Sequence, residues 1–151
     1  SREASVSERL KKAGIACEKW TVLRKGGIED ICRATLKAFR DRLKKEGRSW
    51  IPDVLYFNDN FASQCALLSL VEAGVRIPED VCFVTWSNAG EGPFWHKSLS
   101  RVEINPFDSG KIFAEYVLRY LKTNRKRRPT SIKPVFIPAD TFPINCAKDN
   151  K

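Results

Sequence analysis

The stretch PDVLYFNDNFASQCALLSLVEAGVRIPEDVCFVTW, residues 52–86, decides the fold class. It holds two apolar runs of strand length, 54–57 and 81–86, on either side of a helical run over 61–73 that Gly74 can close. Strands that are apolar almost throughout are typical of parallel sheets that are buried on both faces. A strand, a helix and a second strand in this order predict a right-handed βαβ unit.

The same alternation of strands and helices continues on both sides of this stretch. The spacing of apolar residues predicts helices over 5–13, 28–45 and 107–121, and short strands over 20–23, 101–104, 135–137 and 142–144. We therefore expect an α/β fold with three layers, α/β/α, around a mainly parallel sheet.

The composition fits one domain that buries a core of its own. The chain has 151 residues, of which 42% are hydrophobic and 30% charged, which argues against a disordered chain. No run approaches the roughly 20 apolar residues of a membrane-spanning helix. Residues 1–5 lack the apolar core of a secretory signal, and the chain has no Met, so we expect a fragment or a processed chain.

The net charge of +9 raises the question of a nucleic-acid partner. The densest basic run, 122–128, lies in a predicted loop, and a second cluster, 40–45, lies on the polar face of a predicted helix. Neither cluster has the interleaved aromatic side chains of a surface that binds single strands. Solvated surface is the favoured interpretation, and phosphate contact by 122–128 is the alternative.

The cysteines indicate a reducing compartment. They are odd in number and widely spaced: Cys17, Cys32, Cys65, Cys82 and Cys146. A disulfide framework typically has an even number of closely spaced cysteines, so we expect buried, reduced thiols and a cytoplasmic protein.

Polar side chains follow both strands of the central unit. Asn58, Asp59 and Asn60 come after the first strand, and Ser87 and Asn88 come after the second. Ligands of parallel α/β sheets bind at the carboxyl ends of the strands. Amides and carboxylates can bind sugar hydroxyls while an aromatic ring covers the apolar face of the sugar. The alternative for Asp59 and Asn60 is capping of the next helix, and for Trp86 it is a place in the core.

Signals for other chemistry are weak. The single histidine, His96, has no partner at metal-ligand spacing, and the chain has no nucleophile elbow, P-loop or dinucleotide fingerprint. Glu29 and Asp30 are explained by their place at a helix start. We expect no catalytic residue, no metal site and no cofactor.

The chain has NDN at 58–60, IPEDVCFVTWSN at 77–88 and LSRVEINPFDSG at 99–110. With these motifs, segments 52–81 and 99–110 resemble the effector domain of lactose-repressor/galactose-repressor transcription regulators. In that family a strand ending in "ND" leads into a helix, followed by "VPxDVxVVGxDD" and "PLTTVxxDPxxxG". The order is kept from Arg2 to about Ile144.

The resemblance implies a type I periplasmic-binding-protein fold, in which a ligand binds between two α/β lobes. Residues 1–151 are then expected to be the C-terminal lobe of the effector-binding and dimerisation domain. The DNA-binding helix-turn-helix and most of the N-terminal lobe are absent, and residues 132–146 form strands that return towards the missing lobe.

The resemblance also implies ligand-binding residues. The family's arginine falls at Arg2, and its carboxylate after the strand falls at Asn60, with Asp59 just before it. Trp86 and Asn88 stand in the segment where the family has "GxDD". An aromatic position of the family falls at Gly26, which departs from the pattern.

The helix over 61–73 is apolar on all sides, which is unusual for a helix with one solvated face. In the family this helix lies at a two-fold interface, which implies a homodimer contact through Cys65, Ala66 and Leu70. The alternative is that these side chains lie in the core of their own lobe.

We therefore expect a non-enzymatic sensor that binds a small-molecule effector, a sugar or a derivative. It forms a homodimer, contacts DNA only through a domain absent from this chain, and contacts no membrane. The alternatives are a periplasmic sugar-binding protein of an uptake system, which shares the fold, and a doubly wound enzyme domain.

Overall fold

The computed structural model describes residues 2–22, 26–125 and 132–143, without the side chains of 2–5. Its sheet has the strand order β1 (Val54–Phe57), β2 (Cys82–Asn88), β3 (Ser100–Ile104) and β4 (Val135–Ile137). The first three strands are parallel, and β4 runs antiparallel to β3. The predicted α/β fold with a mainly parallel sheet is confirmed.

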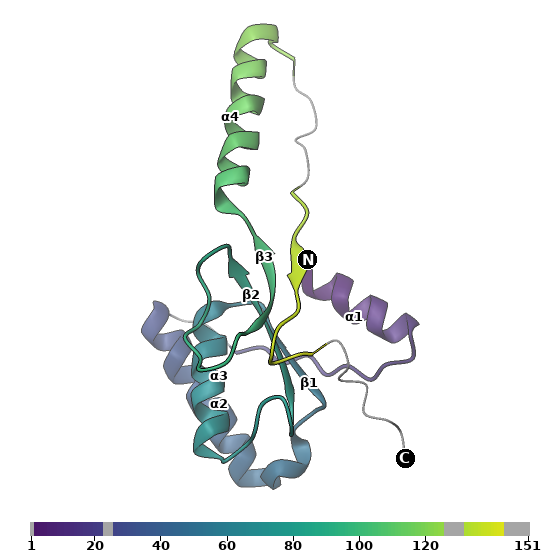
Figure 1. The fold of residues 1–151 in the computed structure, drawn as a ribbon, viewed down its shortest axis with the longest axis vertical. Coiled ribbons are helices and arrows are strands. Elements are labelled where there is room, and N and C mark those ends of the chain that lie inside the picture. The colour runs from purple at the N-terminus through teal and green to yellow at the C-terminus, as the bar shows by residue number, and fades with distance from the viewer. Residues whose placement is uncertain (1, 23–25, 126–131, 144–151) are drawn as a thin grey trace.

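The helices cover the sheet unevenly. They are α1 (Arg2–Lys12), α2 (Ile28–Glu46), α3 (Asn60–Glu72) and α4 (Pro106–Thr123), with a 3-10 turn, η1, at Gly47–Trp50. Figure 1 shows α2 and α3 packed together on one side of the strands and α1 on the other side. The sequence predicted these four helices to within a few residues at each end.

The core lies between the sheet and the pair α2 and α3. Phe39 of α2, Leu67 of α3 and Phe83 of β2 are each at most 1% exposed. The rings of Phe57 and Phe83 stack with centroids 5.1 Å apart. At the surface, Arg40 of α2 donates to Glu72 of α3 at 2.8 Å, and this guanidinium lowers the pKa of Glu72.

Helix α3 of the βαβ unit begins and ends close to where the sequence predicted. The backbone at Gly74 has φ +66°, a conformation that favours glycine. Its N–H donates to the carbonyl of Val71 at 2.8 Å, and the N–H of Val75 donates to Leu70 at 2.9 Å. This arrangement satisfies the last carbonyls of α3 and turns the chain towards β2.

The predicted strand over 20–23 is wrong for its described part, because Trp20–Val22 is not in a strand. The Trp20 ring packs instead against Phe39, at 5.2 Å between centroids, and against Trp50, at 5.3 Å. Arg42 lies 4.9 Å from the Trp20 ring and donates to Glu18 at 2.8 Å. Aromatic packing on α2 therefore holds this segment where backbone pairing was expected; Leu23 is outside the described residues.

The end of the described chain joins the same sheet. After β4, the Thr141 hydroxyl donates to the Phe83 carbonyl at 2.8 Å and accepts from the Ser100 N–H at 2.9 Å. Of the strand predicted over 142–144, residues 142 and 143 are not in a strand and 144 is outside the described residues.

Helix α4 projects away from the body of the lobe in Figure 1. None of its residues is buried, and Phe107 and Leu121 are 80% and 72% exposed. The amphipathic helix predicted over 107–121 is confirmed, but it does not cover the sheet. Within the described ranges, no helix is long and apolar enough to span a membrane.

The four described cysteines form no disulfide with one another. Cys65 and Cys82 are buried as expected, Cys32 is half-buried, and Cys17 is exposed. Cys146 lies outside the described residues.

Candidate ligand-binding site

The carboxyl ends of β1 and β2 bring the predicted polar residues to one edge of the sheet. Phe57 at the end of β1 is in register with Thr85 of β2. Asn58–Asn60 therefore leave the sheet beside the last residues of β2, Ser87 and Asn88. This is the edge at which parallel α/β sheets bind ligands.

Asp59 caps α3. Its backbone is extended, with φ −143°, and its carboxylate accepts from the Ala62 N–H at 2.8 Å. The capping alternative is confirmed for Asp59, and it accounts for this carboxylate without a ligand.

Asn60 and Ser87 present polar atoms that lack a partner. The Asn60 side-chain nitrogen donates to the Glu91 carbonyl at 2.9 Å, whereas its Oδ1 is buried without a hydrogen bond among the described residues. The Ser87 side chain is 1% exposed, and its Oγ is unpartnered in the same sense. Because an unsatisfied buried polar atom costs about 1–3 kcal/mol, such atoms in a native fold call for a water or a ligand.

Glu91 connects the two strand ends, a role that the sequence did not reveal. Its carbonyl accepts from Asn60, its N–H donates to the Asn88 carbonyl at 3.0 Å, and its carboxylate accepts from the Asn88 amide at 2.8 Å. Two of these contacts use backbone atoms, which any residue possesses. Only the structure could therefore identify this loop position.

The structure does not place Trp86 on the face of β2 that carries Ser87, and it does not describe the side chain of Arg2. Side chains alternate along a strand, so Trp86 of β2 points to the opposite face of the sheet from Thr85 and Ser87. It is half-buried there. Arg2 begins α1, but its side chain is outside the described residues.

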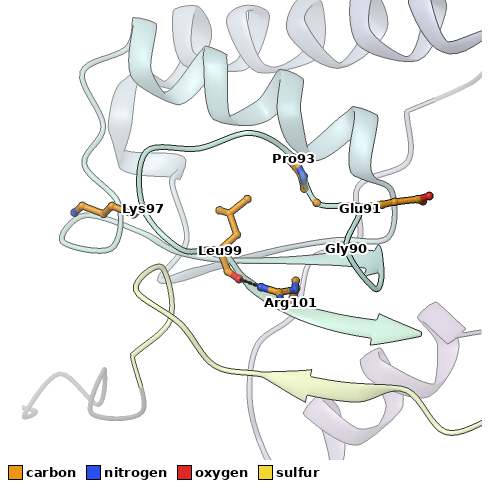
Figure 2. A pocket seen from close by; sticks show the side chains of 7 residues that line it. Gly90, Glu91, Pro93, Lys97, Leu99 and Arg101 are labelled. Carbon is orange, nitrogen blue, oxygen red and sulfur yellow. Dashed lines mark hydrogen bonds between the residues drawn. The ribbon is translucent and has the colours of Figure 1, made fainter. Parts of the chain in front are cut away.

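A cavity of about 250 Å³ lies beside this edge. Figure 2 shows Gly90, Glu91 and Pro93 at one part of its wall, Leu99 across from them and Arg101 below, with Lys97 pointing away. Arg101 donates to Glu103 at 3.0 Å, and Lys97 donates to the Ile77 carbonyl at 2.8 Å, so both cations are already partnered. Since ligand pockets usually measure about 300–1,000 Å³, this volume fits part of a ligand site.

The sequence predicted no metal site and no catalytic residue. His96 is exposed in the loop after β2, where its ring lies 4.7 Å from that of Trp95. Among the described residues, no three His, Cys, Asp or Glu side chains gather as metal ligands.

The three residues predicted at a two-fold interface lie inside the lobe. Cys65, Ala66 and Leu70 are 4%, 0% and 0% exposed, and Ala66 and Leu70 belong to the core cluster. This placement matches the alternative that they are core residues. The exposed apolar side chains of α3 are Phe61, Leu68 and Val71, at 45%, 48% and 52%.

The chain is similar to one family model and to several solved structures. A family model described as "Periplasmic binding protein-like domain" matches residues 1–142. No curated protein sequence matches the chain.

Several solved structures share the fold. A LacI family transcriptional regulator from Bifidobacterium animalis subsp. lactis DSM 10140 has a TM-score of 0.73 and 16% identity, and the alignment covers 94% of this chain and 49% of that one. A LacI family regulator from Arthrobacter sp. FB24, in complex with lactose, has a TM-score of 0.66 and 19% identity, with 92% and 50% covered. A transcriptional regulator in complex with cellobiose has a TM-score of 0.65 and 15% identity, with 90% and 39% covered. The chain spans half or less of the length of these three proteins.

Proposed function

Because the chain belongs to the family of periplasmic binding protein-like domains, we propose that it is the C-terminal, ligand-sensing lobe of a lactose-repressor-type transcription regulator. The observation that carries the proposal is a pair of buried atoms at the carboxyl edge of the sheet, Asn60 Oδ1 and Ser87 Oγ, which have no partner among the described residues. In this proposal the chain binds an effector and does not catalyse a reaction.

A sugar or sugar derivative is the effector that this chemistry favours. An amide oxygen and a hydroxyl are neutral groups that pair with the hydroxyls of a sugar. The cations beside the cavity, Lys97 and Arg101, are occupied by protein acceptors, so they offer little to an anionic ligand. Two of the structurally similar regulators were solved with lactose and with cellobiose.

The binding test uses the longer protein that, in this proposal, contains both lobes. Lactose and cellobiose are titrated calorimetrically against the wild type and Asn60→Ala. Loss of one hydrogen bond to a buried amide should weaken binding by about tenfold, or 1.4 kcal/mol.

The control is Asn124→Gly, at the far end of α4, where φ is 48° and glycine keeps the backbone conformation. It should bind as the wild type does. Equal affinity of Asn60→Ala and the wild type for a sugar that binds would remove Asn60 from the site.

The second lobe of the proposal would cover α4. β3 leads out of the body into α4 and β4 returns beside β3, so these two strands would connect the lobes (Figure 1). This extension, formed by α4 and β4, exposes Phe107, Phe113 and Leu121 on α4, at 80%, 68% and 72%, and Val135 on β4, at 60%. Apolar side chains at this density are typical of a surface that packs against another part of a protein. In this proposal, residues 132–143 return from the second lobe to this one, which is the reverse of the expected direction; residues 144–146 lie outside the described residues.

A homodimer through α3 is the second part of the proposal. Phe61, Leu68 and Val71 follow one another along the helix and are about half exposed. The exposed Phe94, at 86%, lies three residues after Glu91, whose carbonyl accepts from Asn60 next to Phe61. These side chains replace the buried Cys65, Ala66 and Leu70 as the expected interface.

Sedimentation of this chain tests the interface with a matched pair of variants. Leu68 and Leu118 are 48% and 57% exposed on α3 and α4, so Glu at either position should be tolerated by the fold. Leu68→Glu should give a monomer and Leu118→Glu should remain a dimer. The reverse result would place the contact on α4, and a monomeric wild type would favour the alternative of a periplasmic sugar-binding protein.

The mechanism that follows is a two-state motion of rigid lobes. An effector that contacts both lobes shifts the protein towards the closed state by its difference in affinity for the two states. In a dimer, closure would change the spacing of DNA-binding domains outside this chain. We propose a cytoplasmic location for such a regulator.

A further inference from the structure

Helices α2 and α3 bring two cysteines together at their packed interface. The Cys32 thiol of α2 lies 4.0 Å from the carbonyl oxygen of Phe61. Phe61 stands one helical turn before Cys65, whose N–H points at that same carbonyl in an α-helix. Burial, together with the neighbouring Cys32 thiol, raises the pKa of Cys65 to about 12. The two cysteines therefore lie close together where α2 packs on α3, although 33 positions separate them in the sequence.

The two thiols differ in access to solvent. Cys32 is half-buried, in the second turn of α2, whereas Cys65 is 4% exposed. A small oxidant dissolved in water therefore reaches Cys32 first. Cys65, held beside it, is placed to react with whatever forms on Cys32.

We propose that Cys32 and Cys65 are a peroxide-sensitive pair that closes into a disulfide between α2 and α3. The Cys32 thiolate attacks hydrogen peroxide: an S–O bond forms, the O–O bond breaks, and the released hydroxide takes a proton to become water. The Cys65 sulfur then attacks the Cys32 sulfenic acid: an S–S bond forms, the S–O bond breaks, and the hydroxide leaves as water with the Cys65 proton. The two sulfurs together lose two electrons, which reduce one peroxide.

The disulfide would tie α2 to the part of α3 that follows the candidate ligand site. Asp59 and Asn60 begin α3, and the negative charge of Asp59 is close enough to act on Cys65. Oxidation would thus fix the position of the helix start that carries both residues. This pair follows from the packing of α2 on α3 and does not depend on the proposed regulator or its effector.

The test is peptide mapping of the folded chain after treatment with hydrogen peroxide. Remaining thiols are alkylated, and the protein is digested with trypsin without reduction. The peptides spanning residues 26–33 and 49–76 should appear linked, and dithiothreitol should release them. Exposed Cys17 reports that the oxidant acted, and buried Cys82 should stay alkylatable only after unfolding.

Two variants keep the experiment decisive. Cys17→Ser should form the same linked peptide, whereas Cys65→Ser should leave a sulfenic acid on Cys32 that dimedone traps. The proposal is overturned if Cys32 and Cys65 are both recovered alkylated after Cys17 has been oxidised. It is overturned equally if Cys32 proceeds to a sulfinic acid while Cys65 in the wild type stays reduced.

Discussion

The body of the lobe and its extension are built from similar helices in different surroundings. In the body, α2 packs on α3 and α3 packs on β1 and β2, and Phe39, Leu67 and Phe83 are at most 1% exposed. The extension consists of α4, which has no buried residue, and β4, which pairs with β3 of the body. The comparison shows that an amphipathic helix can be complete although its apolar face is not buried.

The two regions should also differ in how they unfold. Most helical stability in proteins comes from packing, and none of the 18 residues of α4 is buried. α3 shares the core with two strands, so it can open only when the body unfolds. We expect the body to unfold cooperatively, and the extension to fray while the body stays folded.

The largest effect should come from a matched pair of phenylalanine truncations. Phe83→Ala leaves a cavity in the body and should lower the free energy of unfolding by about 3–5 kcal/mol. Phe113→Ala, in α4 at 68% exposure, should change it by less than about 0.5 kcal/mol. Urea denaturation followed by tryptophan fluorescence measures both. Similar losses for the two variants would mean that α4 is part of the cooperative unit.

A smaller effect is expected from removal of the two helix caps. Asp59 accepts from Ala62 at the start of α3, and Asn105 accepts from the Phe107 N–H at 2.9 Å at the start of α4. Asp59→Ala should cost the body about 1 kcal/mol of unfolding free energy. Asn105→Ala should reduce helical circular dichroism without moving the urea midpoint. A shift of the midpoint by Asn105→Ala would contradict the separation of the two regions.

The smallest effect concerns a surface ion pair on the body. Arg76 donates to Asp80 at 2.6 Å, and this bond with the Arg76 N–H holds the pKa of Asp80 at about 2. A carboxyl whose pKa is lower in the folded state stabilises the fold above its unfolded pKa of about 3.9. That contribution is lost as the pH falls from about 4 through 2.

The urea midpoint at several pH values checks this. At pH 6 the urea midpoint of the wild type should be modestly higher than that of Asp80→Asn. The difference between the two midpoints should vanish near pH 2. A difference that does not depend on pH would show that the pair contributes by packing alone.

The sequence predicted the elements better than their surroundings. The runs at 54–57 and 81–86 became adjacent parallel strands, and Gly74 ended α3, because these features depend on local periodicity and backbone conformation. The position of Trp20 depended on Phe39 and Trp50, which lie far along the chain. No local pattern could reveal that packing.

The candidate site was predictable in the same uneven way. Asn60 and Ser87 could be placed at one edge, because the carboxyl ends of neighbouring parallel strands coincide. The Glu91 contacts could not be foreseen, since two of them are made by backbone atoms. The inward orientation of Cys65, Ala66 and Leu70 was equally hidden, because α3 is apolar on every side.

Hydrogen exchange of the amides in α3 and α4 tests the division of the lobe most directly. In the wild type, α3 should exchange at the rate set by global unfolding, and α4 should exchange much faster. Phe83→Ala should accelerate exchange in α3 by the factor that its loss of stability implies, and leave α4 unchanged. Protection of α4 equal to that of α3, lost together with it in Phe83→Ala, would contradict the account.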